Sequence, residues 1–234
     1  MKTHYYGIVG SGRLASHLRE YFHLSRIPSV NWNRKQDNSP PAAKLAACDV
    51  IILAVSDGAI EEMARHFKDS GKRVVHLSGA NSFDGVSGCH PLMTFPEELF
   101  SLEKYRQIPF VLDEDCPEWS DLFPQWPNPH YRIKKELKSL YHSWCVMGGN
   151  FTTLLWHKAN SVFSDELNLP SEILVPYLRQ TTSACLSPGK EGLSGPLVRN
   201  DRNTMERNKA ALGKTWAGIY EAFEKAYYSD PIFN

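Results

Sequence analysis

The chain has 234 residues, which is enough for one large domain or two modest ones. Hydrophobic residues make up 42% of it and charged residues 22%, a composition that excludes a disordered or fibrous protein. The 26 Lys and Arg residues balance the 26 Asp and Glu residues, so there is no broad basic field to bind nucleic acid or anionic membranes. We therefore expect a globular protein in which any anion site is local.

Neither a membrane segment nor a disulfide framework is indicated. The longest apolar run, Val50–Val55, is far shorter than the roughly 20 residues that cross a bilayer. The first residues are polar and aromatic and do not form the apolar core of a signal peptide, so we expect a soluble cytoplasmic protein with no membrane partner. The 5 cysteines are scattered and include no Cys-x-x-Cys pair, which predicts reduced thiols.

Strand and helix patterns alternate through the first part of the chain. Strands are predicted at residues 4–9, 27–32, 49–55 and 73–77, and further short strands at residues 88–92, 109–112 and 131–133. Helices are predicted at residues 14–22, 42–47 and 59–67, and a short helix with a connection within residues 116–129. This alternation predicts a mostly parallel sheet with right-handed crossovers and covered faces.

The pattern changes after Lys134. Leu137, Leu140, Tyr141 and Trp144 recur at helical spacing, and no strand signal returns. We therefore predict an α/β protein with two domains, a Rossmann-type domain at residues 1–134 and an all-helical domain at residues 135–234.

A glycine-rich turn directly follows the first strand. Gly10-Ser11-Gly12-Arg13-Leu14-Ala15 fits the G-x-G-x-x-G/A pattern of dinucleotide-binding turns. In that pattern Gly10 permits the tight turn, Gly12 lets the backbone approach a pyrophosphate, and Ala15 lets the helix pack close to the sheet. Free N–H groups at the start of the helix then face the diphosphate. The alternative is a glycine turn that binds nothing, and the surrounding strand and helix pattern favours binding.

The end of the second strand bears on which coenzyme is bound. Folds that prefer NAD place an acidic residue there, about 20 residues after the glycine turn. This chain has Asn33, Arg34 and Lys35 instead, with no acid. An acid would repel a 2′-phosphate, whereas the Arg34 guanidinium can bind it. These residues therefore predict NADP, and the alternative is a solvated basic turn.

Ligands of doubly wound sheets bind outside the carboxyl ends of the strands. The ends of the third and fourth strands are therefore predicted to contact the coenzyme, through Ala54, Val55, Ser56 and Ser78. Asp57 is interpreted as a helix cap, because Asp satisfies the first N–H groups of helices well. His76 lies inside an apolar strand and is interpreted as a satisfied core histidine.

Three polar residues are predicted to be catalytic. His90 titrates near neutrality and can exchange a proton with a carbonyl oxygen. Cys89 precedes it, but neighbouring side chains on a strand point in opposite directions, so no metal site is predicted. His142 and Asn150 lie on the helix that follows the predicted boundary. Arg199 can either hold an anionic group of the substrate or pair with a carboxylate inside the helical domain.

With these motifs the chain resembles a family of NADP-dependent oxidoreductases that join a Rossmann-like domain to a helical domain, designated DUF2520. It is distantly similar to the superfamily of 6-phosphogluconate dehydrogenase and pyrroline-5-carboxylate reductase. The matching segments are Gly10–Ala15, Asp49–Asp57, His76–Gly79, His90–Leu92, Tyr141–His142, Asn150 and Gly195–Asp201. The chain departs from the family pattern at Met93, Asn200 and Asn208, where Gln, Gly and His are usual. The resemblance implies a homodimer formed through the helical domain.

We therefore predict an NADP-dependent oxidoreductase that transfers a hydride between the nicotinamide and a small polar carbonyl, imine or hydroxy compound. The alternative hypothesis is a non-catalytic NADP(H)-binding sensor or regulatory protein. It stays open because the superfamily's catalytic Lys and Asn spacing is not reproduced between Tyr141 and Asn150. A third hypothesis, a purely structural helical dimer, requires that no nucleotide binds.

Overall fold

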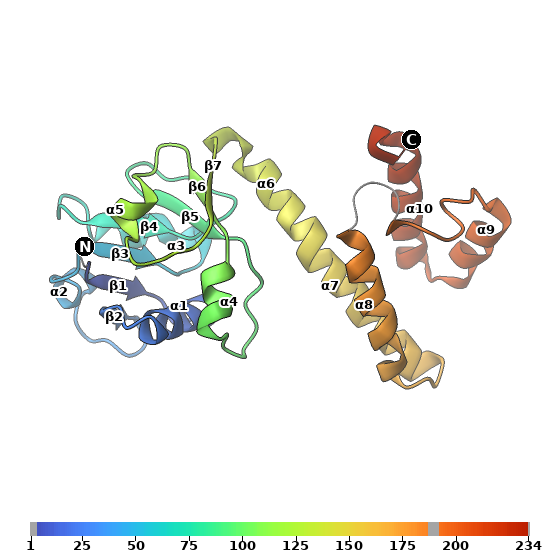
Figure 1. Cartoon of the computed structure of the whole chain (residues 1–234), viewed down its shortest axis with the longest axis horizontal. Coiled ribbons are helices and arrows are strands. Elements are labelled where there is room, and N and C mark those ends of the chain that lie inside the picture. The colour runs from blue at the N-terminus through green and yellow to red at the C-terminus, as the bar shows by residue number, and fades with distance from the viewer. Residues whose placement is uncertain (1–3, 187–191, 234) are drawn as a thin grey trace. The chain divides into compact units, whose positions relative to one another are not determined.

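The computed structural model describes residues 4–186 and 192–233 of the chain. They fall into two compact units, Met1–Leu154 and Leu155–Asn234. Figure 1 draws the elements in chain order, with the strands all in the first unit. No helix among the described residues is long and apolar enough to cross a membrane.

The first unit is built on a seven-stranded sheet of order β2-β1-β3-β4-β5-β6-β7. Its strands are β1 (Tyr6–Val9), β2 (Ser29–Trp32), β3 (Val50–Leu53), β4 (Arg73–His76), β5 (Ser87–Pro91), β6 (Phe110–Asp113) and β7 (His130–Ile133). All neighbours pair in parallel except β5 and β6, which are antiparallel. The prediction of an α/β protein with a mostly parallel Rossmann-type sheet is confirmed, and each predicted strand is present.

The strand β3 explains why the sheet is covered on both faces. Its four residues are fully buried, and they alternate between two apolar clusters. Val50 and Ile52 face the cluster that contains α1 (Arg13–Leu24), whereas Ile51 and Leu53 face the cluster that contains α3 (Asp57–Arg65). A continuous apolar run rich in β-branched residues is the pattern expected of a strand buried in this way.

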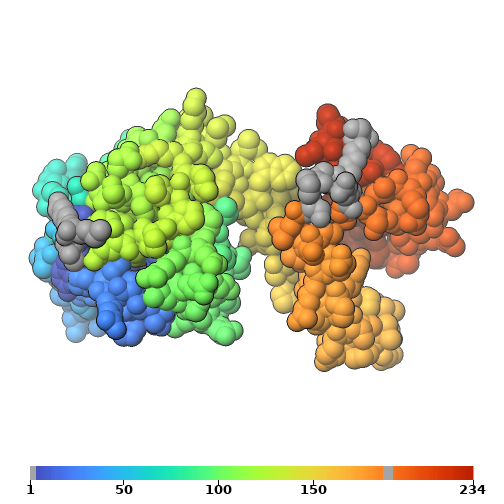
Figure 2. Space-filling model, in the orientation of Figure 1, coloured from blue at the N-terminus to red at the C-terminus, as the bar shows by residue number. Residues whose placement is uncertain are grey.

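Helices on the two faces complete the first unit. The short helix α2 (Pro41–Lys44) lies between β2 and β3, and α5 (Trp119–Leu122) lies between β6 and β7. Trp119 and Trp126 belong to the same apolar cluster as α1. Residues 116–129 therefore form the predicted short helix and connection. A helix that the sequence analysis did not predict, α4 (Leu102–Gln107), packs beside α1 (Figure 2).

A helical run begins where the strands end. The 3₁₀ turn η1 (Lys135–Leu137) leads into α6 (Lys138–Cys145), the π-helical segment η2 (Val146–Phe151) and α7 (Thr152–Ser161). The predicted helical domain begins at residue 135, whereas α6 belongs to the first compact unit, which ends at Leu154. The first helix after the predicted boundary therefore packs with the sheet.

The described part of the second unit contains helices and no strand. After the π-helical segment η3 (Val162–Glu166) and the turn η4 (Ser171–Ile173), it comprises α8 (Leu174–Cys185), α9 (Arg202–Ala211), α10 (Lys214–Ser229) and the turn η6 (Pro231–Phe233). Lys209 of α9 pairs with Glu224 of α10 at 3.1 Å, and Trp156 of α7 meets Tyr177 of α8 edge to face. The helical composition that the sequence predicts for this part of the chain is therefore present.

Gly10, in the turn after β1, contacts the ends of both neighbouring strands, β2 and β3. Its N–H donates to the Trp32 carbonyl at 2.9 Å, and its φ of 139° is a value that favours glycine. A Cβ at this position would lie 2.2 Å from the carbonyl oxygen of Ala54. The close approach of β1 and β3 at this end of the sheet therefore requires glycine.

Replacing Gly10 with alanine is expected to lower the free energy of unfolding by more than about 2 kcal/mol, because it adds backbone strain and a clash. Gly12→Ala is the matched control, since its φ is −75° and a Cβ there meets nothing within 4 Å. Urea unfolding followed by circular dichroism measures both variants. Equal stability of the two variants would contradict this account of Gly10.

Candidate functional site

The start of α1 lies at the point where the strand order reverses. β1 has β2 on one side and β3 on the other, and the chain leaves β1 through Gly10 to enter the helix. Gly12 is the N-cap, and no described side chain caps the first N–H groups of the helix. Ser11, Gly12 and Arg13 are exposed, whereas Ala15 is fully buried against the sheet. The predicted motif therefore forms an open helix start in the crevice where doubly wound folds bind dinucleotides.

The turn after β2 exposes two cations. Val9 of β1 pairs with Trp32 of β2, so this turn follows the strand next to the glycine motif. Asn33 is buried and its side-chain oxygen accepts the N–H groups of Lys35 and Gln36, so its side chain shapes the turn. Arg34 and Lys35 are exposed. Of the three predicted residues, these two have side chains available to a ligand.

One acidic residue contacts the same turn. Asp37 accepts the N–H of Asn33 at 2.8 Å and forms an ion pair with Lys44. The hydrogen bond from Lys44 holds the pKa of the Asp37 carboxyl below its ordinary value. Because Lys44 compensates this charge, Asp37 does not offset the cations of Arg34 and Lys35.

Ser78 ties the ends of β3 and β4 together. Its hydroxyl donates to the Asp57 carboxylate at 2.9 Å and accepts the N–H of Asn81 at 3.1 Å. Asn81 donates to the same carboxylate at 2.8 Å. The interpretation of Asp57 as a helix cap is wrong, because Ser56 is the N-cap and Asp57 is the first residue of α3. Its carboxylate instead joins α3 to the loop after β4.

The other predicted coenzyme contacts at the end of β3 differ in exposure. Ala54 is buried, Val55 is half-buried and Ser56 is exposed.

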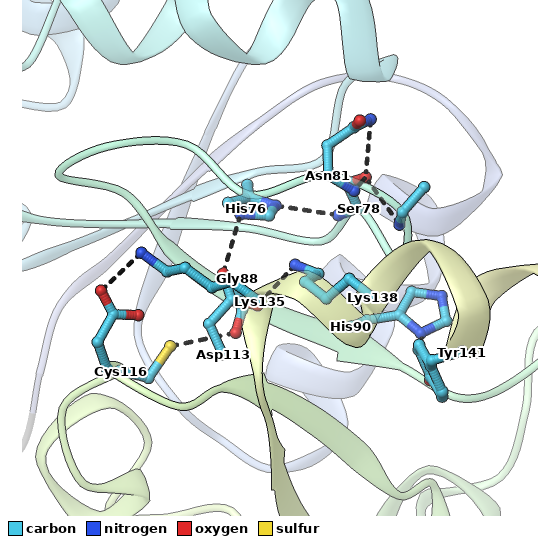
Figure 3. A network of polar contacts seen from close by, with 12 residues as sticks. His76, Ser78, Asn81, Gly88, His90, Asp113, Cys116, Lys135, Lys138 and Tyr141 are labelled. Atoms are coloured by element: carbon cyan, nitrogen blue, oxygen red, sulfur yellow. Dashed lines mark hydrogen bonds and ion pairs between the residues drawn. The ribbon is translucent and has the colours of Figure 1, made fainter.

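Two of the predicted catalytic residues meet at the end of β5. The rings of His90 on β5 and His142 on α6 lie 5.8 Å apart and nearly perpendicular. Gly79, after β4, lies against both of them: a Cβ there would lie 2.6 Å from His142 and 3.0 Å from His90. The Tyr141 hydroxyl and Nδ1 of His90 form a hydrogen bond of 2.7 Å. Figure 3 shows His90 and Tyr141 side by side.

An open cleft of about 780 Å³ joins these histidines to the glycine motif. Its lining residues are Arg13, Leu14, His90, Leu92, Met93, Thr94, Phe95, His142, Trp144, Cys145, Val146, Gly148, Gly149 and Asn150. The structure therefore brings the three predicted catalytic residues together with the first turn of α1.

Arg199 lies in the second unit, in the loop before α9, and is exposed. Asp201 is the N-cap of α9, and its carboxylate accepts the N–H of Thr204. Asn200 has a φ of 53°, a left-handed conformation that glycine adopts freely and Asn tolerates. This conformation explains how Asn can stand where the family usually has Gly.

Burial keeps the imidazole of His90 neutral. Burial, together with the neighbouring His142 and Lys138, lowers the pKa of His90 from 6.5 to about 4, against the opposing effect of Asp57. Burial also raises the pKa of the Tyr141 phenol above its ordinary value. The hydrogen bond between the two therefore joins neutral groups at neutral pH. It leaves Nε2 of His90 as the nitrogen that can exchange a proton with a ligand.

Lys138 and Asp113 form a buried ion pair that was not predicted from the sequence. Both are at most 2% exposed, and Nζ of Lys138 lies 2.6 Å from Oδ1 of Asp113 (Figure 3). Lys138 precedes Tyr141 and His142 by three and four residues, so the three share one helix face. That spacing is the signal in the sequence that could have found Lys138. Asp113, at the end of β6, has no comparable signal, because its partner is distant in the chain.

His76 is only partly the satisfied core histidine that the sequence predicts. It is fully buried, and its Nδ1 accepts the N–H of Ser78 at 3.2 Å. Its Nε2 lies 4.0 Å from Asp113 and has no hydrogen-bond partner among the described residues. Burial lowers its pKa from 6.5 to about 3, so it too is neutral at neutral pH.

Because the pKa of buried His90 is lowered, we expect the folded protein to lose stability in acid. Between pH 6.5 and about 4 the unfolded chain binds a proton at His90 that the folded chain does not, so the free energy of unfolding falls as the pH falls. His90→Gln should reduce this slope by at most about 1.4 kcal/mol per pH unit, the value for one proton. Urea titrations at several pH values measure the slope.

The exposed His23 supplies the control for this titration. His23→Gln should leave the slope as it is in the unsubstituted protein. The account of His90 fails if His90→Gln and His23→Gln give the same slope.

Comparison with known proteins agrees with the fold and with the resemblance. A family model described as "Domain of unknown function (DUF2520)" matches residues 112–227, and this match confirms the resemblance to that family. No curated protein gives a significant match. Many solved structures match the chain.

Three of these structures are informative, and each covers nearly the whole chain. A "putative NADP oxidoreductase" from Bacteroides fragilis has a TM-score of 0.76 at 19% identity, over 96% of this chain and 97% of that chain. An imine reductase from Streptomyces aurantiacus has a TM-score of 0.64 at 11% identity, over 96% and 93%. Pyrroline carboxylate reductase from Plasmodium falciparum, solved with NADP bound, has a TM-score of 0.60 at 12% identity, over 99% and 100%. At these identities the likeness is one of fold.

Proposed function

We propose that this chain, with its DUF2520 match at residues 112–227, is an NADP(H)-dependent oxidoreductase acting on a small polar carbonyl, imine or hydroxy compound. One observation carries the proposal. Arg13 and Leu14, in the first turn of α1, line the same cleft as His90, His142 and Asn150. A helix start suited to a diphosphate therefore opens into a cleft whose side chains can exchange protons and donate hydrogen bonds.

The residues at the glycine motif fit the coenzyme. The space around Gly12 is open to 4 Å on the side where a Cβ would lie, so backbone N–H groups of the turn can approach a diphosphate. Arg34 and Lys35 would bind the 2′-phosphate, because their side chains are exposed and no uncompensated acid lies in their turn. Ala54, Val55 and Ser56 would border the coenzyme at the end of β3. Similar folds described as NADP oxidoreductases or solved with NADP support this assignment.

We assign two roles to the side chains of the cleft, proton exchange and substrate binding. The coenzyme, when bound, supplies or accepts the hydride. His90, neutral and bonded to Tyr141 at Nδ1, would exchange a proton with the oxygen or nitrogen of the substrate through Nε2. His142 and Asn150 would orient the polar group of the substrate, and the role of Arg199 as a residue that holds an anionic group stays a prediction. Ser78 would border the nicotinamide as a fixed part of the wall, because its hydroxyl proton is donated to Asp57.

Binding of NADPH is expected to stabilise the folded chain. A ligand at 100 times its Kd adds about 2.7 kcal/mol, which a thermal shift detects, and NADH should give a smaller shift. Arg34→Ala should weaken NADPH binding about 10-fold or more, because it removes a charge-assisted hydrogen bond, and should leave NADH binding unchanged. Gly12→Ala should weaken binding of both coenzymes.

The exposed Lys68 supplies the matched control for the loss of one surface cation. Lys68→Ala should leave both shifts as they are in the unsubstituted protein. Equal shifts with NADPH and NADH would contradict the coenzyme preference, and no shift with either would contradict the proposed function. Oxidation of NADPH with a panel of carbonyl compounds and imines then separates an enzyme from a sensor, which would bind the coenzyme and turn over none of them.

We further propose a homodimer in which helix residues 137–154 of two copies pair. Exposed apolar side chains recur along this helical run, before, within and after the π-helical segment η2, and we call them the apolar stripe. The stripe consists of Leu137, Leu140, Trp144, Met147, Phe151 and Leu154, each between 43% and 65% exposed. A second copy is the occupant that the stripe favours, because a stripe of this kind is complementary to itself in an isologous pair.

Sedimentation equilibrium should therefore find a dimer at micromolar concentration. Phe151→Glu combined with Leu154→Glu should give a monomer, because charges would be buried in the paired apolar stripes. Ser143→Glu, exposed on the same helix but outside the stripe, is the control and should remain dimeric. A monomeric unsubstituted protein, or a dimer that survives the double substitution, would refute this pairing.

A further inference from the structure

A buried ion pair lies at the junction of the sheet and α6. Asp113 ends β6 and is 1% exposed, and Lys138 begins α6 and is 2% exposed. Their charged atoms lie 2.6 Å apart. Apart from this contact, the carboxylate oxygens and Nζ have no hydrogen-bond partner among the described residues.

The surrounding backbone is shaped to admit the Asp113 carboxylate. Gly88 on the neighbouring strand β5 faces it, and a Cβ at Gly88 would lie 2.5 Å from Oδ2 of Asp113. A pair of apolar side chains of similar volume would hold such a junction together equally well, because desolvation offsets much of the attraction between buried charges. Stability alone therefore does not account for charges at this place.

The ion pair is connected to the cleft through α6. Lys138 lies one helical turn before Tyr141 and His142, on the same face of the helix. Tyr141 bonds to His90, and His142 packs against Gly79 beside the same imidazole. An anchor at Lys138 therefore fixes the turn of helix that places both residues on His90. Figure 3 shows this sequence of side chains from Asp113 through Lys138 to Tyr141 and His90.

We propose that Lys138, anchored by Asp113, is a positioning residue that holds Tyr141 and His142 on His90 and keeps a positive charge behind its imidazole. Lys138 does not line the cleft, so it acts through His90 and not on the substrate. The proposal rests on the proposed function only in taking His90 as the residue that meets the substrate.

The charges around His90 determine in which direction its pKa should change when Lys138 is replaced. The described groups that act on its imidazole include His76 of β4, Asp57 of α3, and Lys138, Tyr141 and His142 of α6. Lys138 and His142 lower the pKa of His90, and Asp57 raises it. Loss of the Lys138 charge should therefore make His90 easier to protonate, whereas a purely packing role of Lys138 would leave its titration unchanged.

Titration of His90 by NMR, with ¹⁵N-labelled imidazoles and without coenzyme, tests the proposal. In the unsubstituted protein His90 should titrate near pH 4 and show a hydrogen bond at Nδ1. Lys138→Met should raise its pKa toward 6.5 and weaken that hydrogen bond, and Lys138→Arg should preserve both. A pKa that stays near 4 in folded Lys138→Met would overturn the proposal.

Lys138→Met leaves a buried carboxylate unpaired and can prevent folding. The double variant Asp113→Leu with Lys138→Met removes both charges and should fold, because apolar side chains then fill the junction. Its His90 pKa should also rise, because the positive charge behind the imidazole is gone. An unchanged His90 pKa in this variant would likewise overturn the proposal.

The same double variant separates this proposal from the proposed function. It leaves the glycine motif untouched, so its NADPH thermal shift should equal that of the unsubstituted protein. If the unsubstituted protein gives no NADPH shift while the titrations behave as described, the proposed function fails and the positioning role stands. If the shift is present and the titrations do not change, the positioning role fails and the proposed function stands.

Discussion

The contact between Gly10 and the carbonyl of Ala54 is the constraint on which the arrangement depends. A side chain at residue 10 would lie 2.2 Å from that oxygen, so only glycine lets the end of β1 lie this close to β3. The same residue bonds to Trp32 of β2. The chain can then enter α1 at the reversal of strand order, with the first helical N–H groups facing outward. The open helix start and the neighbouring cations of Arg34 and Lys35 both follow from this junction.

A second group of contacts forms the other side of the cleft. Glycines again mark the close approaches: Gly79 leaves room for the two imidazoles, and Gly88 leaves room for Asp113. The antiparallel pairing of β5 with β6 brings His90 and Asp113 to the same region from opposite chain directions. Lys138, the first residue of α6, forms a buried ion pair with Asp113. The helix that carries Tyr141 and His142 is therefore anchored at its first residue. The chemistry of the cleft therefore depends on polar contacts inside the first unit.

The sequence predicted what is local and regular. The buried run of β3, the glycine motif and the seven strands all follow from periodicity and from short motifs, and the structure contains them. The antiparallel pairing of β5 and β6 and the short helix α4 were not predicted, because neither has a local signal. The role of Asp57 was predicted wrongly, because its hydrogen-bond partner Ser78 is 21 residues away in the chain. The role of Asp113 was not predicted, because its ion-pair partner Lys138 lies on another element. Contacts between distant residues decide the roles of polar side chains, and a single sequence does not record them.

The central claim is that the open start of α1 binds a diphosphate in a cleft shared with His90. A crystal structure of the protein in saturating NADPH tests it most directly. The account predicts density for the diphosphate against the backbone N–H groups of residues 11–14, with the 2′-phosphate at Arg34 and the nicotinamide in the cleft near His90. Coenzyme bound elsewhere on the chain, or a helix start covered by the protein's own side chains, would contradict it.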